Sequence, residues 1–93
     1  MPWKTNYKME QINRMNYDKE KVDQATLALM WLVTESDKYG SRAWKSFDWS
    51  TLDRLHEKGL ISDPKRKAKS VVLSDEAVEL SEQLFKRMFD RSG

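Results

Sequence analysis

The chain has 93 residues, of which 34% are charged and 39% are hydrophobic, and its formal net charge is +2. This length fits one domain with a modest core, and the apolar content is too high for a wholly disordered chain. The absence of cysteine excludes disulfide frameworks and thiolate metal sites. No apolar run reaches the roughly 18 residues that cross a bilayer, and no signal-peptide pattern is present, so we expect a cytoplasmic protein.

The positive charge is distributed unevenly. Residues 1–17 carry three cations against one carboxylate, a surplus of two that equals the net charge of the whole chain. Residues 18–93 therefore sum to zero, and an anionic partner would have to be attracted by local basic patches. The first 17 residues show no clean hydrophobic period. They are predicted to form a flexible or loosely docked arm, followed by one domain over residues 18–93.

A strong helix is predicted from Lys19 to about Ser36, with Asp18 as its N-cap. Apolar residues recur at helical spacing on the face that we expect to be buried, namely Val22, Ala25, Leu29, Leu32 and Val33. Further apolar residues widen this surface beyond one stripe; they are Leu27, Met30 and Trp31. A helix this apolar should lie at the centre of the domain or meet a second chain. Turn-forming residues over 36–41 then end it.

Two shorter helical segments are expected in the middle of the chain. Residues 42–47 fit one helical turn that presents two aromatic residues to the core, Trp44 and Phe47. A longer helix follows and ends where Gly59 allows the left-handed conformation. Ser50 with Asp53 matches a capping box, and Asp48 is a competing cap. The residues of this helix that point inward are Leu52 and Leu55.

Two segments with β character, 60–62 and 70–73, flank a polar connection over 63–69 that opens with an Asp-Pro turn signal. We expect them to pair as a β-hairpin. Ser74 then caps a final helix whose first turn is acidic and whose last turn is basic, as the helix dipole favours. Its predicted buried face consists of Ala77, Val78, Ser81, Leu84, Phe85 and Met88.

This order of elements resembles the winged helix-turn-helix. The likeness to regulators of the multiple-antibiotic-resistance type is carried by Leu52, Leu55, Gly59, Leu60 and Ile61, followed by Lys69, Val71, Leu73 and Ser74. It covers about residues 20–90. It implies that the helix before Gly59 enters the major groove, while the hairpin, or wing, contacts the backbone or minor groove. The sequence departs from that pattern because only residues 40–47 are left for the second helix.

A closer resemblance is to a family of small bacterial domains with no assigned activity. It is carried by the residues Arg-Ala-Trp-Lys-Ser-Phe-Asp-Trp at 42–49, by the segment 52–64 and by Lys-Ala-Lys-Ser-Val at 67–71. It implies the same fold and a cytoplasmic setting, and nothing about mechanism. The expected fold class is mainly α (α+β) and winged-helix-like, with three to four helices and a two-stranded β-hairpin wing.

The predicted hairpin tip is the clearest candidate site. Four cations stand there against one carboxylate, Asp63, which gives +3 within seven residues. The cations are Lys65, Arg66, Lys67 and Lys69. Phosphate contacts dominate the affinity of proteins for nucleic acid, and a compact basic tip suits them. The competing interpretation is a solvated hairpin whose lysines keep a strand edge from pairing.

The predicted recognition helix gives a weaker signal. Arg54 has the side chain that reads guanine, and further candidate contacts are Lys58, Arg42 and Lys45. The outward residues of the helix also include three carboxylates against two cations, a sum of −1. The alternative is therefore an ordinary amphipathic helix with intrahelical ion pairs.

Other side chains have simpler explanations. The tryptophans Trp31, Trp44 and Trp49 are expected in the core, although such a surplus can also form an exposed patch. His56 lacks the repeated ligands of a zinc site and any nucleophile at a motif spacing, so a half-exposed structural histidine is expected. We predict no enzyme, no metal, no cofactor and no small-molecule ligand.

Two hypotheses remain. The first is a nucleic-acid-binding or transcription-associated regulatory module whose basic wing contacts the phosphates of double-stranded DNA. The alternative is a protein–protein interaction module that binds another protein or forms a homodimer, as the wide apolar face of residues 22–33 favours. Neither hypothesis involves a membrane.

Overall fold

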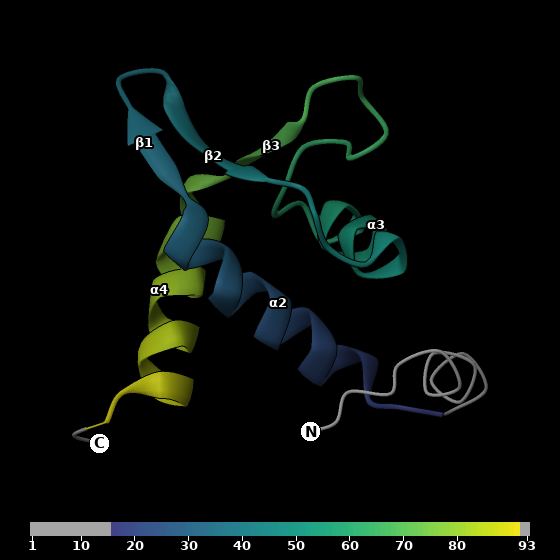
Figure 1. Ribbon diagram of the computed structural model, residues 1–93, viewed down its shortest axis with the longest axis vertical. Coiled ribbons are helices and arrows are strands. Elements are labelled where there is room, and N and C mark those ends of the chain that lie inside the picture. Colours follow the sequence, from purple (N-terminus) through teal and green to yellow (C-terminus); the bar gives the residue numbers. More distant parts are fainter. Residues whose placement is uncertain (1–15, 92–93) are drawn as a thin grey trace, which may run out of the picture.

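The computed structural model describes residues 16–91, so the predicted arm over 1–17 lies almost entirely outside the described residues. The described residues form three helices and one three-stranded antiparallel sheet (Figure 1). The helices are α2 (Lys19–Val33), α3 (Trp49–Glu57) and α4 (Asp75–Phe89). The strands are β1 (Glu35–Asp37), β2 (Gly40–Trp44) and β3 (Ser70–Leu73). The fold class is therefore α+β.

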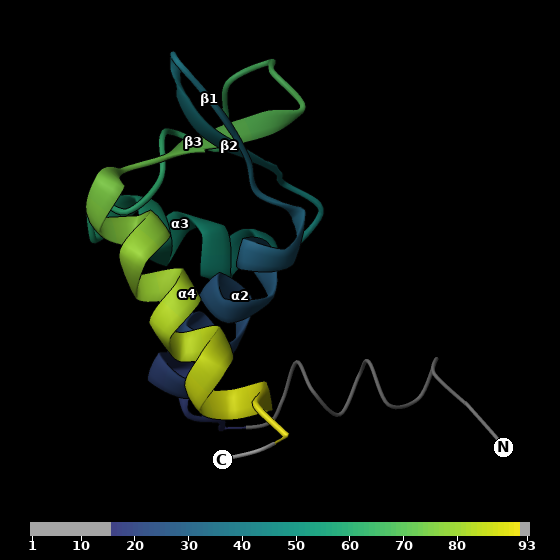
Figure 2. The same cartoon turned by 90° about the vertical axis from the view of Figure 1, so that its left-hand side faces the viewer.

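The sheet has the order β1-β2-β3, and β3 joins the β1–β2 hairpin from a distant part of the sequence. Ala43 pairs with Val71 and Ser41 with Leu73. Because side chains alternate along a strand, Ala43, Val71 and Leu73 share one buried face, while Arg42 and Trp44 lie on the other, exposed face. Figure 2 shows the sheet lying across one end of the α2–α4 pair.

The core lies between the three helices and the inner face of the sheet. Its largest apolar members are Leu27 and Met30 from α2, Leu52 and Leu55 from α3, Val71 from β3 and Leu84 from α4. Burying one such side chain contributes about 1.5–3 kcal/mol to the free energy of folding. The aromatic rings extend the α2–α4 contact, since the centroid of Trp31 lies 5.0 Å from that of Phe85.

The start of each helix follows the sequence predictions closely. The N-caps are Asp18, Asp48 and Ser74, whose side chains accept hydrogen bonds from the backbone N–H three residues later at 3.1, 3.0 and 3.1 Å. Asp48, rather than Ser50, therefore caps α3. Gly59 has φ +78° and lets the chain leave α3, as predicted.

The prediction of which face of α2 is buried is wrong. The buried residues are Asp23, Leu27, Ala28 and Met30. By contrast, Leu29, Leu32 and Val33 are 42%, 60% and 43% exposed. Apolar residues occupy two neighbouring stripes of this helix, and periodicity alone does not say which stripe meets the core. The helix also ends at Val33 instead of near Ser36, where β1 begins to pair with β2.

The helical turn predicted over 42–47 is also wrong, because residues 40–44 form β2. Asp37 Oδ1 accepts a hydrogen bond from the N–H of Tyr39 at 2.8 Å, and Gly40 has φ +132°, so the chain reverses into a hairpin. Trp44 and Trp49 are 59% and 57% exposed, which contradicts their prediction as core residues. Phe47 does pack against the core.

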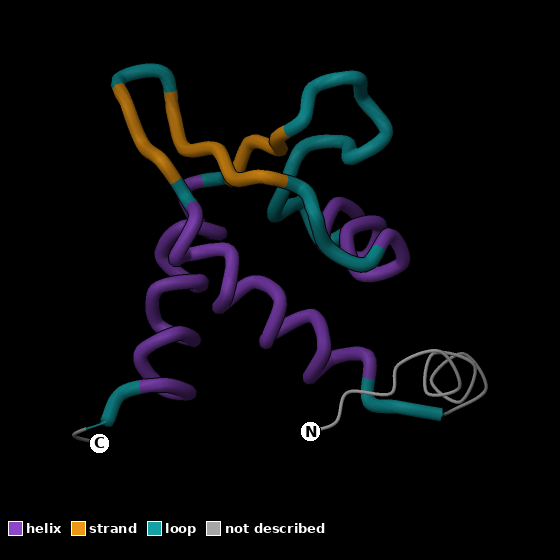
Figure 3. The backbone as a smooth tube through the Cα atoms, in the orientation of Figure 1, coloured by secondary structure: helices purple, strands orange, loops and turns teal. Residues whose placement is uncertain are grey.

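The two-stranded wing is not confirmed. Residues 60–62 contact the end of β3 through the isolated bridge of Ile61 with Leu73, hydrogen bonds between Ser62 and Val72, and a bond from the Ser74 N–H to the Leu60 carbonyl, but they form no strand of the sheet. The main partner of β3 is β2, and the segment from Ser62 to Lys69 is a loop (Figure 3). The segment left for the second helix of a winged helix-turn-helix, residues 40–47, contains the strand β2 and no helix. On α4, Ala77, Ser81 and Leu84 are buried as predicted, while Met88 is 40% exposed.

Two substitutions within α3 test these assignments. Leu52→Ala should lower the free energy of unfolding by about 2–5 kcal/mol, because Leu52 is fully buried. Trp49→Ala should lower it by about 1 kcal/mol or less, because the larger ring lies mostly in solvent. Urea unfolding followed by circular dichroism measures both values. Equal losses for the two variants would contradict the exposed position of Trp49.

Candidate nucleic-acid interface

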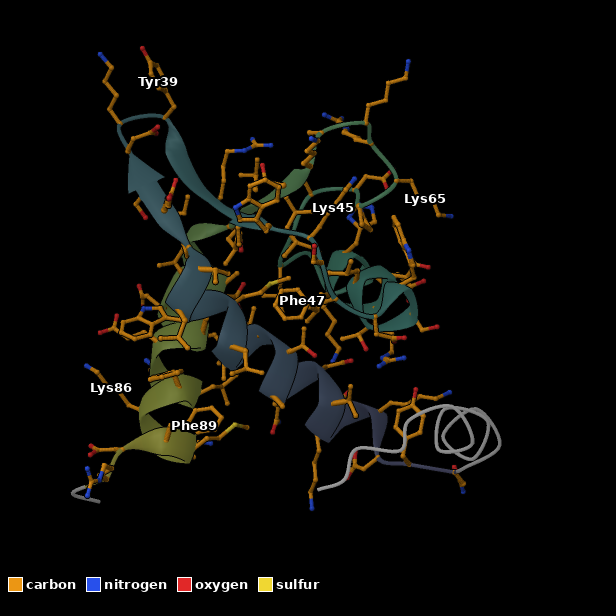
Figure 4. The ribbon with its side chains drawn as sticks, viewed as in Figure 1. Tyr39, Lys45, Phe47, Lys65, Lys86 and Phe89 are labelled. Atoms are coloured by element: carbon orange, nitrogen blue, oxygen red, sulfur yellow. The ribbon has the colours of Figure 1, made fainter. Side chains whose placement is uncertain are left out.

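The predicted cationic tip lies on the loop between α3 and β3, and residues 65–69 are here called the basic loop. All five residues are exposed. Figure 4 shows the side chain of Lys65 pointing away from the rest of the molecule. Among the described residues, no ion pair involves Lys65, Arg66, Lys67 or Lys69. The four cations are therefore available to an external anion.

The start of this loop is held in one shape. Pro64 is fully buried, and Asp63 Oδ1 accepts a hydrogen bond from the N–H of Lys65 at 2.9 Å. Lys45 Nζ, from the segment after β2, donates to the carbonyl oxygens of Pro64 and Arg66 at 2.7 and 2.5 Å (Figure 4). The same Nζ lies 5.9 Å from the ring centroid of Trp49, at the start of α3. Lys45 therefore positions the basic loop beside the N-terminus of α3.

Arg42 lies at the base of the basic loop. Its guanidinium donates to Ser70 Oγ at 2.8 Å and to the Ser70 carbonyl at 3.3 Å, across the β2–β3 pair. A shallow pocket of about 210 Å³ opens next to it and is lined in part by Trp44 and Lys69. The structure thus brings Arg42 and Lys45 to the same side of the molecule as the basic loop.

Arg54 and Lys58 have a different environment, because both bind Asp23 on α2. The side chain of Asp23 is only 2% exposed. Arg54 Nε donates to Asp23 Oδ1 at 2.8 Å, and Lys58 Nζ donates to Asp23 Oδ2 at 2.9 Å. Lys58 Nζ also lies 2.9 Å from a carboxylate oxygen of Glu20. These four side chains are here called the Asp23 cluster.

The Asp23 cluster changes the surface that α3 offers. A buried carboxylate is costly unless cations and hydrogen bonds surround it, so Arg54 and Lys58 are needed where they are. The exposed residues of α3 are Trp49, Ser50, His56 and Glu57, and Asp53 is half-buried, so the carboxylates of this helix have no free cation of α3 beside them. This surface is not attractive to phosphates.

The pKa of Lys58 reflects the same contacts. The hydrogen bond with Asp23 raises this pKa above its usual value of 10.5, and Glu20 adds to the effect, while partial burial opposes it. Lys58 is consequently a cation throughout the physiological range.

Asp23 was not among the functional residues predicted from the sequence. Its signal was present, because Asp23 falls on the same helical stripe as Leu27 and Met30, and an acid on an apolar stripe requires a cationic partner. The identity of that partner depends on how α3 packs against α2. The role of Ser70 as the acceptor for Arg42 was missed for the same reason, since β2–β3 pairing was not predicted.

His56 lies on α3 near the bridge to β3, and its Nδ1 is 3.0 Å from the carbonyl oxygen of Ile61. Within residues 16–91, no group of three His, Cys, Asp or Glu side chains is arranged to hold a metal ion. None of the helices in this part of the chain combines the length and apolar character of a membrane span.

The fold and the site define a small α+β domain with an exposed basic loop whose start is hydrogen-bonded to Lys45. Residues 18–91 match the family described as a domain of unknown function (DUF6429), and the chain belongs to this family. It is similar to an uncharacterized protein, y4hR, from Sinorhizobium fredii (strain NBRC 101917 / NGR234). The two are 53% identical over 77 residues, which are 83% of this chain and the full length of that protein. No solved structure matches the chain.

The Asp23 cluster can be tested by removing its cations. Arg54→Met together with Lys58→Met should lower the free energy of unfolding by about 3–5 kcal/mol, because the Asp23 charge is left buried without a partner. Adding Asp23→Asn should recover part of that loss. Lys86→Met is the control, since the ion pair of Lys86 with Glu82 is exposed and should contribute less than about 1 kcal/mol. A triple variant no more stable than the double variant would contradict a buried Asp23 charge.

The raised pKa of Lys58 predicts a pH dependence. A cation whose pKa is higher in the folded state contributes stability that is fully present below its unfolded value of about 10.5 and disappears as pH rises through the folded value. The difference in unfolding free energy between the wild type and Lys58→Met should therefore be constant up to about pH 10 and shrink above it. Urea unfolding at stepped pH measures this difference. A difference that grows above pH 10 would have the wrong sign.

Proposed function

We propose that this protein binds nucleic acid through its basic loop, which contacts the phosphate backbone. The observation that carries the proposal is the set of four exposed cations on residues 65–69, for which no ion pair is found within the described residues. The nearest carboxylate in the loop, Asp63, accepts the N–H of Lys65 and so stabilises the turn. The loop therefore presents a concentrated positive charge.

The anchoring of the loop favours binding. Neutralising phosphates releases counterions, and each contact adds to the affinity at low salt. Because Lys45 and Pro64 already fix the start of the loop, less conformational entropy is lost when it meets its ligand. Arg42 and the pocket beside Trp44 extend the same side of the molecule.

We do not propose that α3 contacts the edges of the bases. Arg54 would have to leave Asp23 before it could reach a guanine, and Asp53 and Glu57 would approach the phosphates. We therefore expect binding through the backbone, with little sequence preference. The basic loop follows α3 and Gly59, as the wing of a winged helix-turn-helix follows its recognition helix. A cytoplasmic role associated with transcription would be consistent with such binding.

The second hypothesis, a protein-interaction module, is supported by a different surface. Leu29 and Leu32 of α2 are exposed and belong neither to the basic loop nor to its anchors, while Val33 lines the pocket that Arg42 and Lys69 also line. The two functions are compatible with each other.

Binding is measured by titrating the protein into short labelled duplex DNA, and into the corresponding single strand, at several salt concentrations. Replacing Lys65, Arg66 and Lys67 with alanine should weaken binding at low salt at least about tenfold and lower the salt slope by about 2–3. The matched control replaces Lys86 and Arg87 in the last turn of α4 and Arg91 beyond its end, which removes the same charge. Figure 4 shows Lys86 on the part of α4 that is distant from Lys65. Equal effects of the two triple variants would show attraction by net charge alone and refute the proposed site.

Lys45→Met tests whether the anchoring of the basic loop contributes to binding in addition to its charge. It leaves the four cations of the basic loop in place but removes the hydrogen bonds to Pro64 and Arg66. We expect Lys45→Met to bind nucleic acid more weakly than a variant that lacks a single exposed lysine such as Lys38. The reason is that the unanchored loop must become ordered when it binds, which costs conformational entropy. Absence of duplex and single-strand binding by the wild type at low salt would reject the function altogether.

A further inference from the structure

Two exposed tryptophans lie close to the basic loop. Trp44 and Trp49 are 59% and 57% exposed, whereas Trp31 packs against Phe85. A large aromatic ring left in water forgoes the stability that its burial would contribute, so such rings are usually covered in a small domain. Two exposed rings beside one group of cations therefore indicate a binding surface.

Trp44 is adjacent to the end of the basic loop. It is the register partner of Ser70 in the β2–β3 pair, and the N–H of Lys45 donates to the carbonyl oxygen of Lys69 at 3.2 Å. Trp44 and Lys69 also line the same shallow pocket. The ring of Trp44 therefore borders the last cation of the loop.

Trp49 is adjacent to the start of the basic loop. The ammonium group of Lys45 that lies 5.9 Å from the centre of its ring also donates to the carbonyl oxygens of Pro64 and Arg66. This one lysine connects the ring to the first residues of the loop. The cations of the basic loop are thus bordered by an indole ring at each end.

The charge next to Trp44 differs from that of the loop. Arg42 is the register partner of Glu35 in the β1–β2 pair, and directly opposite residues of such a pair share a face of the sheet. One cation there stands beside one carboxylate, whereas the basic loop has four cations with no ion pair among the described residues. The sheet face around Trp44 therefore suits a neutral, planar group, and the loop suits phosphates.

We infer that the ligand of this surface is a single strand of nucleic acid, whose phosphates contact the basic loop and whose bases stack on Trp44 and Trp49. The inference rests on the proposed function, because the loop supplies the contacts with the phosphates. Every base has a π face, so aromatic side chains bind bases of any sequence. In a duplex each base is already stacked between its neighbours, and the rings reach a base only where the strand is unpaired.

An abasic strand separates stacking from charge, because it keeps the phosphates and lacks the bases. Fluorescence anisotropy of the full chain is measured with four labelled probes of about 12 nucleotides per strand, namely an oligothymidine, an oligouridine, an abasic DNA strand and a DNA duplex. At about 150 mM salt, where the attraction to phosphates is weakened, at least one of the two oligonucleotides should bind at least about fivefold more tightly than the abasic strand and the duplex. The tighter of the two oligonucleotides then identifies DNA or RNA as the ligand.

The failures of the two proposals are distinguishable with the same probes. If neither oligonucleotide exceeds the abasic strand and the duplex by that factor, stacking on the tryptophans is refuted. The proposed function still stands in that case, provided that the abasic strand or the duplex is bound. Absence of binding to all four probes at low salt would reject the proposed function, and the inference with it.

Trp44→Leu and Trp49→Leu each remove one ring and keep every charge. Each variant should bind the oligonucleotide at least about fivefold more weakly, with the salt slope and the affinity for the abasic strand unchanged. Trp44→Phe and Trp49→Phe retain a ring and should recover part of the affinity. Unchanged oligonucleotide binding by both leucine variants would overturn the inference.

Tyr39→Leu is the matched control. Tyr39 is an exposed aromatic residue with a lysine amine, Lys38 Nζ, 5.2 Å from the centre of its ring. Figure 4 shows it at the tip of the β1–β2 hairpin, away from Lys65. This variant should bind the oligonucleotide like the wild type. A loss equal to that of the tryptophan variants would show that any exposed ring contributes, and would refute a site at the basic loop.

Tryptophan emission tests stacking in the unaltered protein. A base stacked on an indole ring quenches its fluorescence, so saturating oligonucleotide should lower the emission of the wild type, and the abasic strand should not. The variant with both Trp44→Leu and Trp49→Leu should lose most of this quenching. Emission that is unchanged at saturation would show that the two rings do not meet the bases and serve a different partner, such as a protein.

Discussion

The buried carboxylate of Asp23 constrains the arrangement of this domain more than any other polar group that the structure describes. With its side chain 2% exposed, it requires cationic donors on both oxygens, and α3 supplies them as Arg54 and Lys58. A charge in such a place is tolerated only with its partners in position, so the cluster fixes α3 against α2. The apolar side chains Leu27, Leu52 and Leu55 then pack in a single arrangement around this contact.

The same constraint divides the cations of the chain into two groups. Arg54 and Lys58 satisfy an internal charge and stabilise the fold. The cations of the basic loop face solvent instead, and Lys45 joins their loop to the start of α3 through two backbone carbonyls. Cations of neighbouring segments therefore have different roles: those of α3 stabilise the fold, and those of the basic loop are exposed to solvent. A surface built from the basic loop suits phosphate contacts, whereas α3 itself is occupied by its contact with α2.

Local signals in the sequence were reliable where a few neighbouring residues determine the outcome. Asp18 and Ser74 cap their helices, Gly59 ends α3 with a positive φ, and Leu52 and Leu55 are buried, all as predicted. Residues 65–69 are exposed, as both the phosphate-binding and the solvated interpretation of the basic tip expect. Arg42 and Lys45 were predicted from the sequence as candidate contacts, but their hydrogen bonds to Ser70, Pro64 and Arg66 depend on contacts between distant segments.

The sequence by itself determined where α2 and α4 begin, their N-caps and the concentration of charge at 65–69, because these depend on interactions over a few residues. Only the tertiary structure decided that residues 40–44 form a strand, that Trp44 is exposed and that α2 buries the stripe of Asp23 and Leu27. A strand gains its hydrogen bonds from a partner that is far away in the sequence. Likewise, a helix with two apolar stripes has no intrinsic preference between them, and the cations of α3 select the one that carries Asp23.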